Sequence, residues 1–294
     1  MLTCMRAYSL DDVHAARKQR DSWWTVFLVD PVACRLTVFV ANHTAVTPNG
    51  LTCLSLALGL GAAVWFAAGQ LAAGAALFYL SFMVDCMDGK IARLKGTGTA
   101  FGLWVDFVGD RIREICCAAG LAFGQYAATG EVAYILLGAG VTVLDLFRYV
   151  NAPQMKRVRE VVRENRAPRD GRNAAAPDGA PAQAPPDDSI EVPAGDPSVQ
   201  PPWGVRRVLR RYRRLGRVLG RHRVRPHLMS GIEFHAAVFV VAPLLGAGAL
   251  LPVSIAAGAL LLLNEAFLIY LLWLFTRTAA PAAPVPAGAR HLPA

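Results

Sequence analysis

Long apolar segments separated by short polar turns dominate the hydropathy pattern of this chain. A helix that crosses a bilayer needs about 20 consecutive, mostly apolar residues. Six segments approach or exceed that length, at approximately residues 51–68, 71–84, 102–126, 132–146, 234–250 and 252–275. The pattern therefore predicts an all-α integral membrane protein built as a bundle of six transmembrane helices.

The N-terminal residues 1–46 have a different pattern. They begin polar, and residues 31–46 are moderately apolar but too short to cross a membrane. Trp23 and Trp24 suit the depth of the lipid headgroups. We therefore expect a cytoplasmic N-terminal segment with a juxtamembrane helix at the interface. Thr47, Pro48 and Asn49 then mark the start of the first membrane helix, because proline is tolerated in the first turn of a helix.

The formal net charge of +9 is concentrated in one region of the chain. Residues 151–230 contain 17 of the 30 Lys and Arg residues, against eight acidic ones. The turns near residues 69, 126–131 and 251 contain no Lys or Arg. Basic loops stay on the cytoplasmic side of a membrane. We therefore expect the basic region, the 90–98 turn and both termini to face the cytoplasm.

The basic region is predicted to be a long cytoplasmic loop between helices in 47–150 and 231–276, with 277–294 as a tail. Within it, 167–202 is rich in Ala, Pro, Gly and Asp, a composition that favours disorder. Residues 203–219 combine helically spaced apolar positions with arginines, which predicts a basic amphipathic helix on the anionic leaflet. An RNA-binding arm is the alternative. Because the segment is close to a membrane helix, we favour membrane lipid and no nucleic-acid partner.

Four aspartates lie at the junction of the second and third apolar segments: Asp85, Asp88, Asp106 and Asp110. A charge at the centre of a membrane helix costs about 2.5–3.5 kcal/mol, so cations are the natural compensation. Spacings of three and four residues place each pair on one face of its helix. A short connection makes these helices neighbours, and an oxygen-only cluster suits Mg²⁺ or Mn²⁺. Two such ions could clamp a pyrophosphate.

Small and basic residues surround these aspartates. Gly89, Ala92 and Gly102 would let a nucleotide approach the backbone closely. Arg93 supplies a fixed cation for a phosphate. Phosphoryl transfer depends mainly on positioning and charge neutralisation, and the segment contains residues suited to both.

The whole segment from Asp85 to Asp110 matches the signature DxxDGxxAR, eight residues, then GxxxDxxxD. In this it resembles the CDP-alcohol phosphotransferase (CDP-alcohol phosphatidyltransferase) family. The resemblance implies a homodimeric six-helix membrane fold with a cytoplasm-facing cavity. It also implies transfer of a phosphatidyl or other phosphoalcohol group from a CDP-linked donor, such as CDP-diacylglycerol, to a hydroxyl with release of CMP.

The same resemblance assigns roles to individual residues. It implies that two divalent cations, Mg²⁺ or Mn²⁺, are held by Asp85, Asp88, Asp106 and Asp110. Asp110 is then also the base that takes the proton of the acceptor hydroxyl. The residues expected to bind the CDP moiety or close its pocket are Pro48, Asn49, Thr52, Gly89, Ala92, Arg93, Thr99 and Gly102. The run that follows Asp110 resembles members that handle inositol or inositol phosphate, so an inositol-type acceptor is one alternative.

Several polar residues allow two interpretations. Arg111, Arg113 and Arg148 could bind an anionic acceptor or pair with Glu114 and Asp145. Asn264 and Glu265 lie within the last apolar segment, where a functional role and pairing with another helix or at the dimer interface are equally consistent. The histidines lack metal-ligand spacing, so we predict core, interface or loop roles for His43, His227 and His235.

A different function class is a divalent-cation transport protein that uses the membrane carboxylates as an ion path. Such a path requires polar residues that continue towards the outer side of the membrane. The outer halves of the predicted helices are apolar. We therefore favour the enzyme over the transporter.

Overall fold

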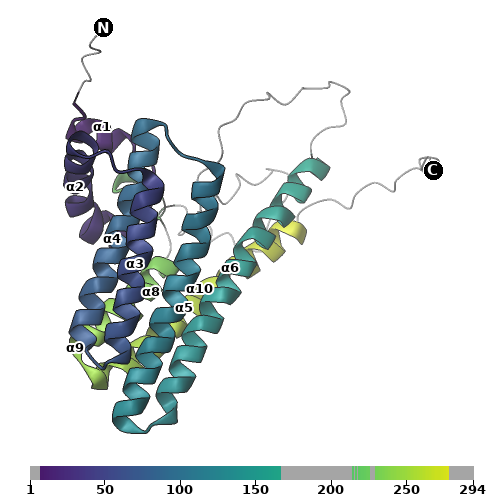
Figure 1. Cartoon of the computed structure of the whole chain (residues 1–294). Coiled ribbons are helices and arrows are strands. Elements are labelled where there is room, and N and C mark those ends of the chain that lie inside the picture. The colour runs from purple at the N-terminus through teal and green to yellow at the C-terminus, as the bar shows by residue number, and fades with distance from the viewer. Residues whose placement is uncertain (1–6, 167–213, 215, 217, 226–228, 278–294) are drawn as a thin grey trace, which may run out of the picture.

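The computed structural model describes residues 7–166, 214, 216, 218–225 and 229–277. Within these ranges the chain is helical, and its only β pairing is an isolated bridge between Asp21 and Val224. Figure 1 shows long helices packed side by side, with the short N-terminal helices at one end. The predicted disordered segment 167–202, most of the predicted basic helix 203–219 and the tail 278–294 lie outside the described residues.

The helices follow one another along the chain with short connections. Their bounds are α1 Leu10–Ala15, η1 Thr25–Val29, α2 Asp30–His43, α3 Pro48–Ala67, α4 Leu71–Lys95, α5 Ala100–Thr129, α6 Val132–Arg166, α8 Gly231–Ala236, η2 Ala237–Val241, α9 Ala242–Leu245 and α10 Ala247–Arg277. The elements η1 and η2 are π-helical stretches within longer helices.

Five of the described helical stretches are long and apolar enough to cross a membrane. They are Thr25–His43, Pro48–Ala67, Leu71–Lys95, Val132–Val162 and Ala247–Arg277. The 30-residue α5 is long enough but less apolar. Its first half carries the charged residues Asp106, Asp110, Arg111, Arg113 and Glu114. The unit Gly231–Leu245 is apolar but shorter. These helices support a multi-pass membrane protein. The predicted count of six spans is reached only if α5 and the unit Gly231–Leu245 also cross the membrane.

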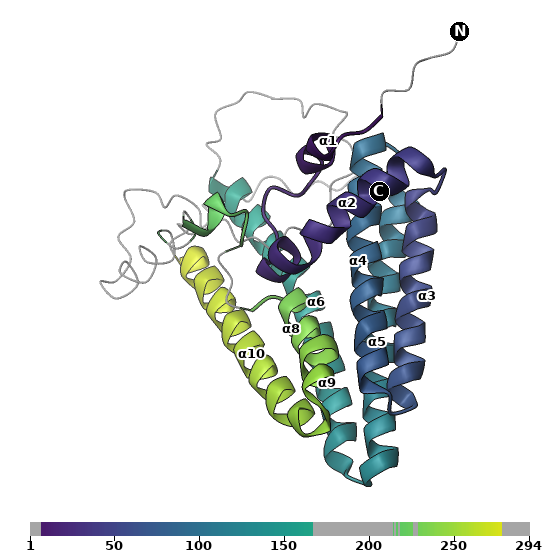
Figure 2. The ribbon, with the colours of Figure 1, turned by 90° about the vertical axis from the view of Figure 1, so that its left-hand side faces the viewer.

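Two sequence-based boundaries were wrong. The N-terminal apolar helix begins at Thr25 rather than residue 31, so it is long enough to span by length and composition. Figure 2 shows α2 lying obliquely across the ends of α3 and α4, an arrangement that also suits an interfacial helix. The predicted segment 234–250 is interrupted at Gly246, whose φ of +100° ends α9. This backbone conformation favours glycine, so Leu250 belongs to α10.

Local capping places the junction of α4 and α5 next to the start of α3. Thr47 caps α3, since its side chain accepts a hydrogen bond from the Gly50 N–H at 3.2 Å. Gly96 ends α4 in the left-handed conformation, with φ of +64°. Thr99 caps α5 by accepting from the Gly102 N–H at 2.9 Å. The tight turn between α4 and α5 therefore brings the two halves of the aspartate signature to the same end of the bundle.

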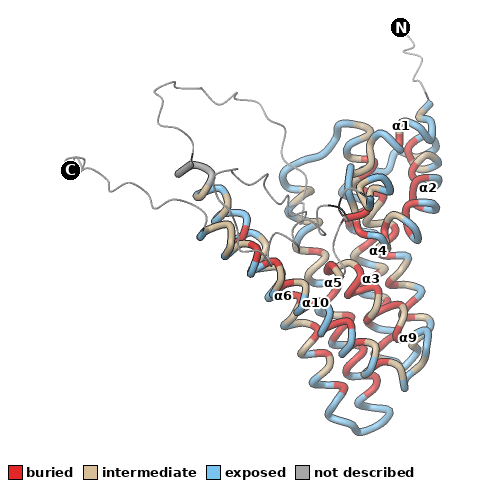
Figure 3. Tube along the Cα trace, turned by 180° about the vertical axis from the view of Figure 1, so that it is seen from behind, coloured by how far each residue is buried: buried red, intermediate tan, exposed pale blue. Residues whose placement is uncertain are grey.

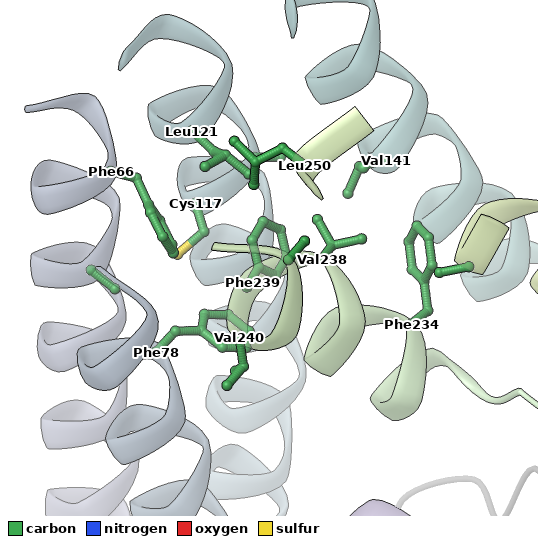
Figure 4. Close-up of a cluster of buried hydrophobic side chains, with 14 of the residues drawn as sticks. Phe66, Phe78, Cys117, Leu121, Val141, Phe234, Val238, Phe239, Val240 and Leu250 are labelled. Atoms are coloured by element: carbon green, nitrogen blue, oxygen red, sulfur yellow. The ribbon is translucent and has the colours of Figure 1, made fainter. Parts of the chain in front are cut away.

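The opposite half of the bundle is a dry core. Phe66, Phe78 and Phe239 pack against one another there, with ring centroids 4.8 Å apart for Phe78 and Phe239 and 6.3 Å apart for Phe66 and Phe239. Figure 4 shows these rings meeting Leu121 and Leu250 between α3, α4, α5 and the C-terminal helices. Buried positions follow the facing sides of the helices in Figure 3. This core fixes the helices at one end, while they diverge towards the end that carries the aspartates (Figure 2).

Glycine allows α3 and α5 to approach closely. A Cβ atom at Gly120 would collide with the backbone carbonyl of Ala63, and one at Gly124 with the carbonyl of Phe66. Small residues at such crossings are typical of membrane helix pairs. Because α5 carries two of the aspartates, this contact fixes their distance from α3.

We expect Gly120→Ala to destabilise the protein, because the new methyl group must push α3 and α5 apart. Overpacking of this kind costs about 1–3 kcal/mol. Gly140→Ala on α6 is the matched control, since no atom lies within 4 Å of the position that its new methyl group would take. There the usual helix preference for alanine, about 1 kcal/mol, favours a neutral or stabilising effect. Thermal unfolding in detergent should separate the two; equal melting temperatures would contradict the close approach.

Candidate active site

A cavity of about 1100 Å³ opens where α3 begins, α4 ends and α5 begins. This exceeds the typical range of ligand pockets, about 300–1,000 Å³. Every residue predicted for the site lines it: Pro48, Asn49, Thr52, Asp85, Asp88, Gly89, Ala92, Arg93, Thr99, Gly102, Asp106 and Asp110. The structure therefore brings the predicted residues to one place.

Three of the four aspartates converge. Carboxylate oxygens of Asp85, Asp88 and Asp106 all lie within 4.8 Å of one another. The Thr52 hydroxyl donates to Asp88 Oδ2 at 2.5 Å, and the Ser55 hydroxyl donates to Asp85 Oδ1 at 3.3 Å. Residues of α3 thus orient the carboxylates of α4 towards α5.

These carboxylates fit a divalent metal site. Their donor atoms are all oxygens, which Mg²⁺ and Mn²⁺ prefer. Asp88 is buried, at 6% exposure, and buried like charges are strongly unfavourable without a compensating cation. Asp85, Asp88 and Asp106 are therefore the residues that would hold a metal ion.

The fourth aspartate, Asp110, lies outside this group of three. Its Oδ1 is 2.5 Å from Arg113 Nη2, and Arg113 Nη1 is 3.3 Å from Asp85 Oδ1. The Arg113 side chain is only 3% exposed and also donates to the Ser55 hydroxyl at 2.9 Å. Arg113 thus joins Asp110 to the carboxylate cluster. Asp110 Oδ1 is thus engaged by Arg113, while the Asp110 side chain remains 24% exposed.

The role of Arg113 was left open by the sequence. The signal that could have indicated it is its position three residues after Asp110, on the same helix face. The structure adds a contact that the sequence could not show: a Cβ atom at Gly59 on α3 would overlap the aliphatic part of the Arg113 side chain. Gly59 therefore leaves the space that Arg113 occupies.

Glycines also shape the predicted nucleotide region. A Cβ atom at Gly102 would collide with the Asn49 amide oxygen and lie 3.0 Å from Thr99 Oγ1. At Gly89 it would lie 3.3 Å from Arg93 Nη1. Larger residues at either position would displace side chains that line the cavity.

The N-terminal segment closes part of the cavity mouth, which the sequence did not indicate. Arg93 Nε donates to the Ala16 carbonyl at 2.7 Å. Arg93, which the sequence predicts to bind a phosphate, therefore also holds the N-terminal segment. Asp21 exchanges backbone hydrogen bonds with the C-terminal part of the basic region: its N–H donates to the Arg223 carbonyl at 2.8 Å, and its carbonyl accepts from the Arg225 N–H at 2.9 Å. Segments some 200 residues apart thus meet at the mouth.

Asp30 anchors α2 beside the same mouth. Lys90 Nζ lies 2.9 Å from Asp30 Oδ1, and Arg223 Nη1 lies 3.2 Å from Asp30 Oδ2. The Lys90 and Asp30 side chains are buried, so this pairing ties α2 to α4 next to the signature.

Arg111 and Arg148, whose roles the sequence left open, form ion pairs within and between α5 and α6. Arg111 forms ion pairs with Glu114 and Asp145, and Arg148 Nη2 lies 3.5 Å from Asp145 Oδ1. The pairing interpretation is therefore confirmed for Arg111 and Arg148, although both also line the cavity.

Glu265 has a partner on a neighbouring helix. The Asn151 side chain of α6 donates to Glu265 Oε2 at 2.9 Å. This contact agrees with the pairing interpretation of Glu265, and it joins α6 to α10.

We expect Asp106→Asn to weaken Mn²⁺ binding by at least about tenfold, because removing a direct ligand should cost no less than removing an outer-shell partner. Electron paramagnetic resonance of free Mn²⁺ measures the binding without turnover. Glu131→Gln, at the exposed turn before α6, is the control and should bind as the wild type does. Unchanged Mn²⁺ binding by Asp106→Asn would exclude this carboxylate as a ligand.

Arg113→Gln should destabilise the protein by about 3–5 kcal/mol, the usual result of breaking a buried ion pair from one side. Asp85 and Asp110 would then repel each other without a nearby guanidinium. Saturating Mg²⁺ should recover part of the lost melting temperature, since a divalent cation supplies the missing charge. Arg35→Gln, at an exposed position of α2, controls for general loss of charge. A metal-independent melting temperature in Arg113→Gln would argue against this explanation.

Comparison with known proteins agrees with the geometry. Residues 45–167 match the family model of CDP-alcohol phosphatidyltransferases. The chain is 30% identical over 96 residues to archaetidylinositol phosphate synthase of Methanothermobacter thermautotrophicus, covering 33% of this chain and 49% of that protein. It is 39% identical over 88 residues to phosphatidylinositol phosphate synthase of Corynebacterium glutamicum, covering 30% of this chain and 38% of that protein.

A third relative, the bifunctional IPC transferase and DIPP synthase of Aquifex aeolicus, is 38% identical over 91 residues, covering 31% of this chain and 21% of that protein. The chain thus spans about half the length, or less, of the curated relatives it matches. The matched family segment contains α3, α4, α5 and the four aspartates. Residues 45–167 therefore form a domain of the CDP-alcohol phosphatidyltransferase family.

Proposed function

We propose that this protein is a metal-dependent CDP-alcohol phosphotransferase that acts in phospholipid or related phosphodiester synthesis. It transfers a phosphatidyl or other phosphoalcohol group from a CDP-linked donor to an acceptor hydroxyl and releases CMP. The observation that carries the proposal is the convergence of Asp85, Asp88 and Asp106 in a large cavity at the end of a membrane helix bundle.

Two divalent cations, Mg²⁺ or Mn²⁺, are proposed to be held by Asp85, Asp88, Asp106 and Asp110. When bound, they supply charge neutralisation for the pyrophosphate of the donor and for the departing CMP. The protein residues do the positioning. Thr52 and Ser55 orient the carboxylates through the hydrogen bonds described above.

The CDP moiety is proposed to lie against the ends of α3, α4 and α5. Gly89, Ala92 and Gly102 leave room for it, and Arg93 and Thr99 offer donors to its phosphates. Pro48, Asn49 and Thr52 close the pocket. In the transfer the acceptor oxygen forms a bond to the phosphorus that carries the alcohol. The phosphorus–oxygen bond to CMP breaks, and Asp110 takes the acceptor proton.

For the acceptor we propose an inositol phosphate. Two findings support this choice. Relatives are named for inositol phosphate products, and the cavity wall beyond Asp110 carries Arg111 and Arg148. A phosphate on the acceptor would find these guanidiniums next to the proposed base. CDP-diacylglycerol is a donor that fits the membrane setting.

We also propose the membrane arrangement. Six spans result when α5 and the unit Gly231–Leu245 cross the membrane with α3, α4, α6 and α10. The cavity end then faces the cytoplasm together with both termini, as the distribution of basic residues favours. A homodimer is proposed from the family resemblance.

Divalent-cation transport is not favoured by the structure. An ion path would have to continue from the carboxylates through the other half of the bundle. That half is filled by the apolar cluster around Phe66, Phe78 and Phe239. Moving a charge through such a core is costly.

The direct test is CMP release by purified protein with Mg²⁺, CDP-diacylglycerol and an inositol phosphate. We expect Asp110→Asn to lower kcat by about 10²–10⁴-fold, the usual contribution of a positioned base, while Mn²⁺ binding remains measurable. Asp11→Asn on α1 is an exposed control. No CMP from any CDP-alcohol and acceptor pair, or full activity of Asp110→Asn, would disprove the proposed reaction.

A further inference from the structure

A second group of ionisable side chains lies in the cavity wall beyond Asp110. Its members come from three helices: Arg111 and Glu114 from α5, Asp145 and Arg148 from α6, and His235 from α8. The side chains of Glu114, Asp145 and His235 are 7%, 5% and 8% exposed. The group thus connects α8 to α5 and α6.

His235 lies between the two carboxylates. Its Nδ1 is 2.9 Å from Glu114 Oε1, and its Nε2 is 3.0 Å from Asp145 Oδ1. Carboxylate oxygens beside both ring nitrogens favour the protonated imidazole over the neutral one. At Nε2 the contact is one of charge and proximity, because neither Nε2 nor Asp145 Oδ1 has a hydrogen-bond partner among the described residues.

Arg111 contacts the same two carboxylates from the other side. Its Nη1 is 2.5 Å from Glu114 Oε2 and is also paired with Asp145 Oδ2. The Tyr149 ring supports the guanidinium, with its centroid 3.8 Å from Arg111 Cζ. His235 and Arg111 thus form a closed arrangement with Glu114 and Asp145.

Arg111 connects this arrangement to the cavity. Its side chain is 14% exposed and lines the cavity wall. An anionic group in the cavity would find the Arg111 guanidinium held from the other side by Glu114 and Asp145.

The geometry points to His235 as a positioning residue that, through Glu114 and Asp145, holds Arg111 at the cavity wall for the phosphate of the acceptor. This inference rests on the proposed function and adds a residue that lies outside the matched segment 45–167. His235 itself acts through Arg111. Without it, Glu114 and Asp145 would lose a contact that fixes their positions, so they would hold Arg111 less firmly at the cavity wall.

A metal ion at the same three residues is the competing explanation, since their ligand atoms also lie within 4.8 Å of one another. The guanidiniums argue against it. Arg111 is already paired with both carboxylates, and Arg148 adds a second cation at Asp145. A divalent cation would have to displace them.

The test compares His235→Gln with the wild type in CMP release, varying donor and acceptor separately. Glutamine keeps a donor but cannot bridge both carboxylates with a positive charge. We expect the KM for inositol phosphate to rise about tenfold or more, the effect of losing one hydrogen bond to a charged group. The KM for CDP-diacylglycerol should stay within about twofold, which is the additivity error of distant sites. His222→Gln, at an exposed position, should leave both values unchanged.

A double-mutant cycle shows whether His235 acts through Arg111. If it does, adding His235→Gln to Arg111→Gln should raise the acceptor KM much less than the product of the single effects. Additive effects, or an equal rise in the KM of donor and acceptor, would overturn the inference. So would a tightly bound metal ion that is lost only in His235→Gln.

Two further measurements keep the inference testable if His235→Gln does not fold or the wild type shows no turnover. Glu114→Gln removes one of the carboxylates held by His235, and a wild-type acceptor KM in this variant would overturn the inference. Without donor, inositol phosphate should raise the melting temperature of the wild type more than that of His235→Gln or, if that variant does not fold, Glu114→Gln. Equal shifts would overturn the inference. Absence of CMP from the wild type alone contradicts only the proposed reaction.

Discussion

Mutual repulsion between carboxylates confined among membrane helices is the constraint on which this structure depends. Asp85, Asp88 and Asp106 are held close together in surroundings where charge is poorly solvated, so each needs a compensating partner. Arg113 supplies one from within the chain, and a divalent cation would supply the rest. The dry core around Phe239 and the glycine contacts of α5 fix the helices firmly enough to keep these charges together.

The cavity wall carries carboxylates and cations together. Besides the four aspartates, α4 contributes Lys90 and Arg93, and α5 contributes Arg111 and Arg113. Further charged residues of the wall come from other segments: Arg17, Lys18, Asp21, Asp30, Arg148, Lys156, Arg223 and Arg225. Side chains of both signs are therefore interleaved around the cavity.

Much of the site could be predicted because its determinants are local. The spacings of Asp85 to Asp88 and of Asp106 to Asp110 are properties of a few adjacent residues, and they led to the prediction of a carboxylate cluster. The structure brings three of these four aspartates together. Membrane length and composition likewise predicted the long helices α3, α4, α6 and α10. The Gly246 break was missed because apolar residues flank it on both sides and only its backbone conformation reveals the turn.

Contacts between distant segments could not be predicted in the same way. Nothing in the spacing of Asp21 and Val224 indicates that they meet, nor that His235 lies between Glu114 and Asp145. Such pairs depend on how the helices pack, and a single sequence carries no record of that. Arg113 is intermediate: its partner Asp110 is three residues away, but its contact with Asp85 requires α4 and α5 to be placed.

The pairing of Asp21 with Val224 has a consequence for how this protein could vary. Residues 167–213 connect two segments that are held in place. The helix α6 packs in the bundle before them, and Arg223 pairs with Asp30 after them. The entropic cost of closing a loop grows slowly, by about 0.6 kcal/mol for each doubling of its length. Every residue named above in the cavity lining lies outside 167–213. Insertions or deletions within 167–213 would therefore leave these lining residues in place.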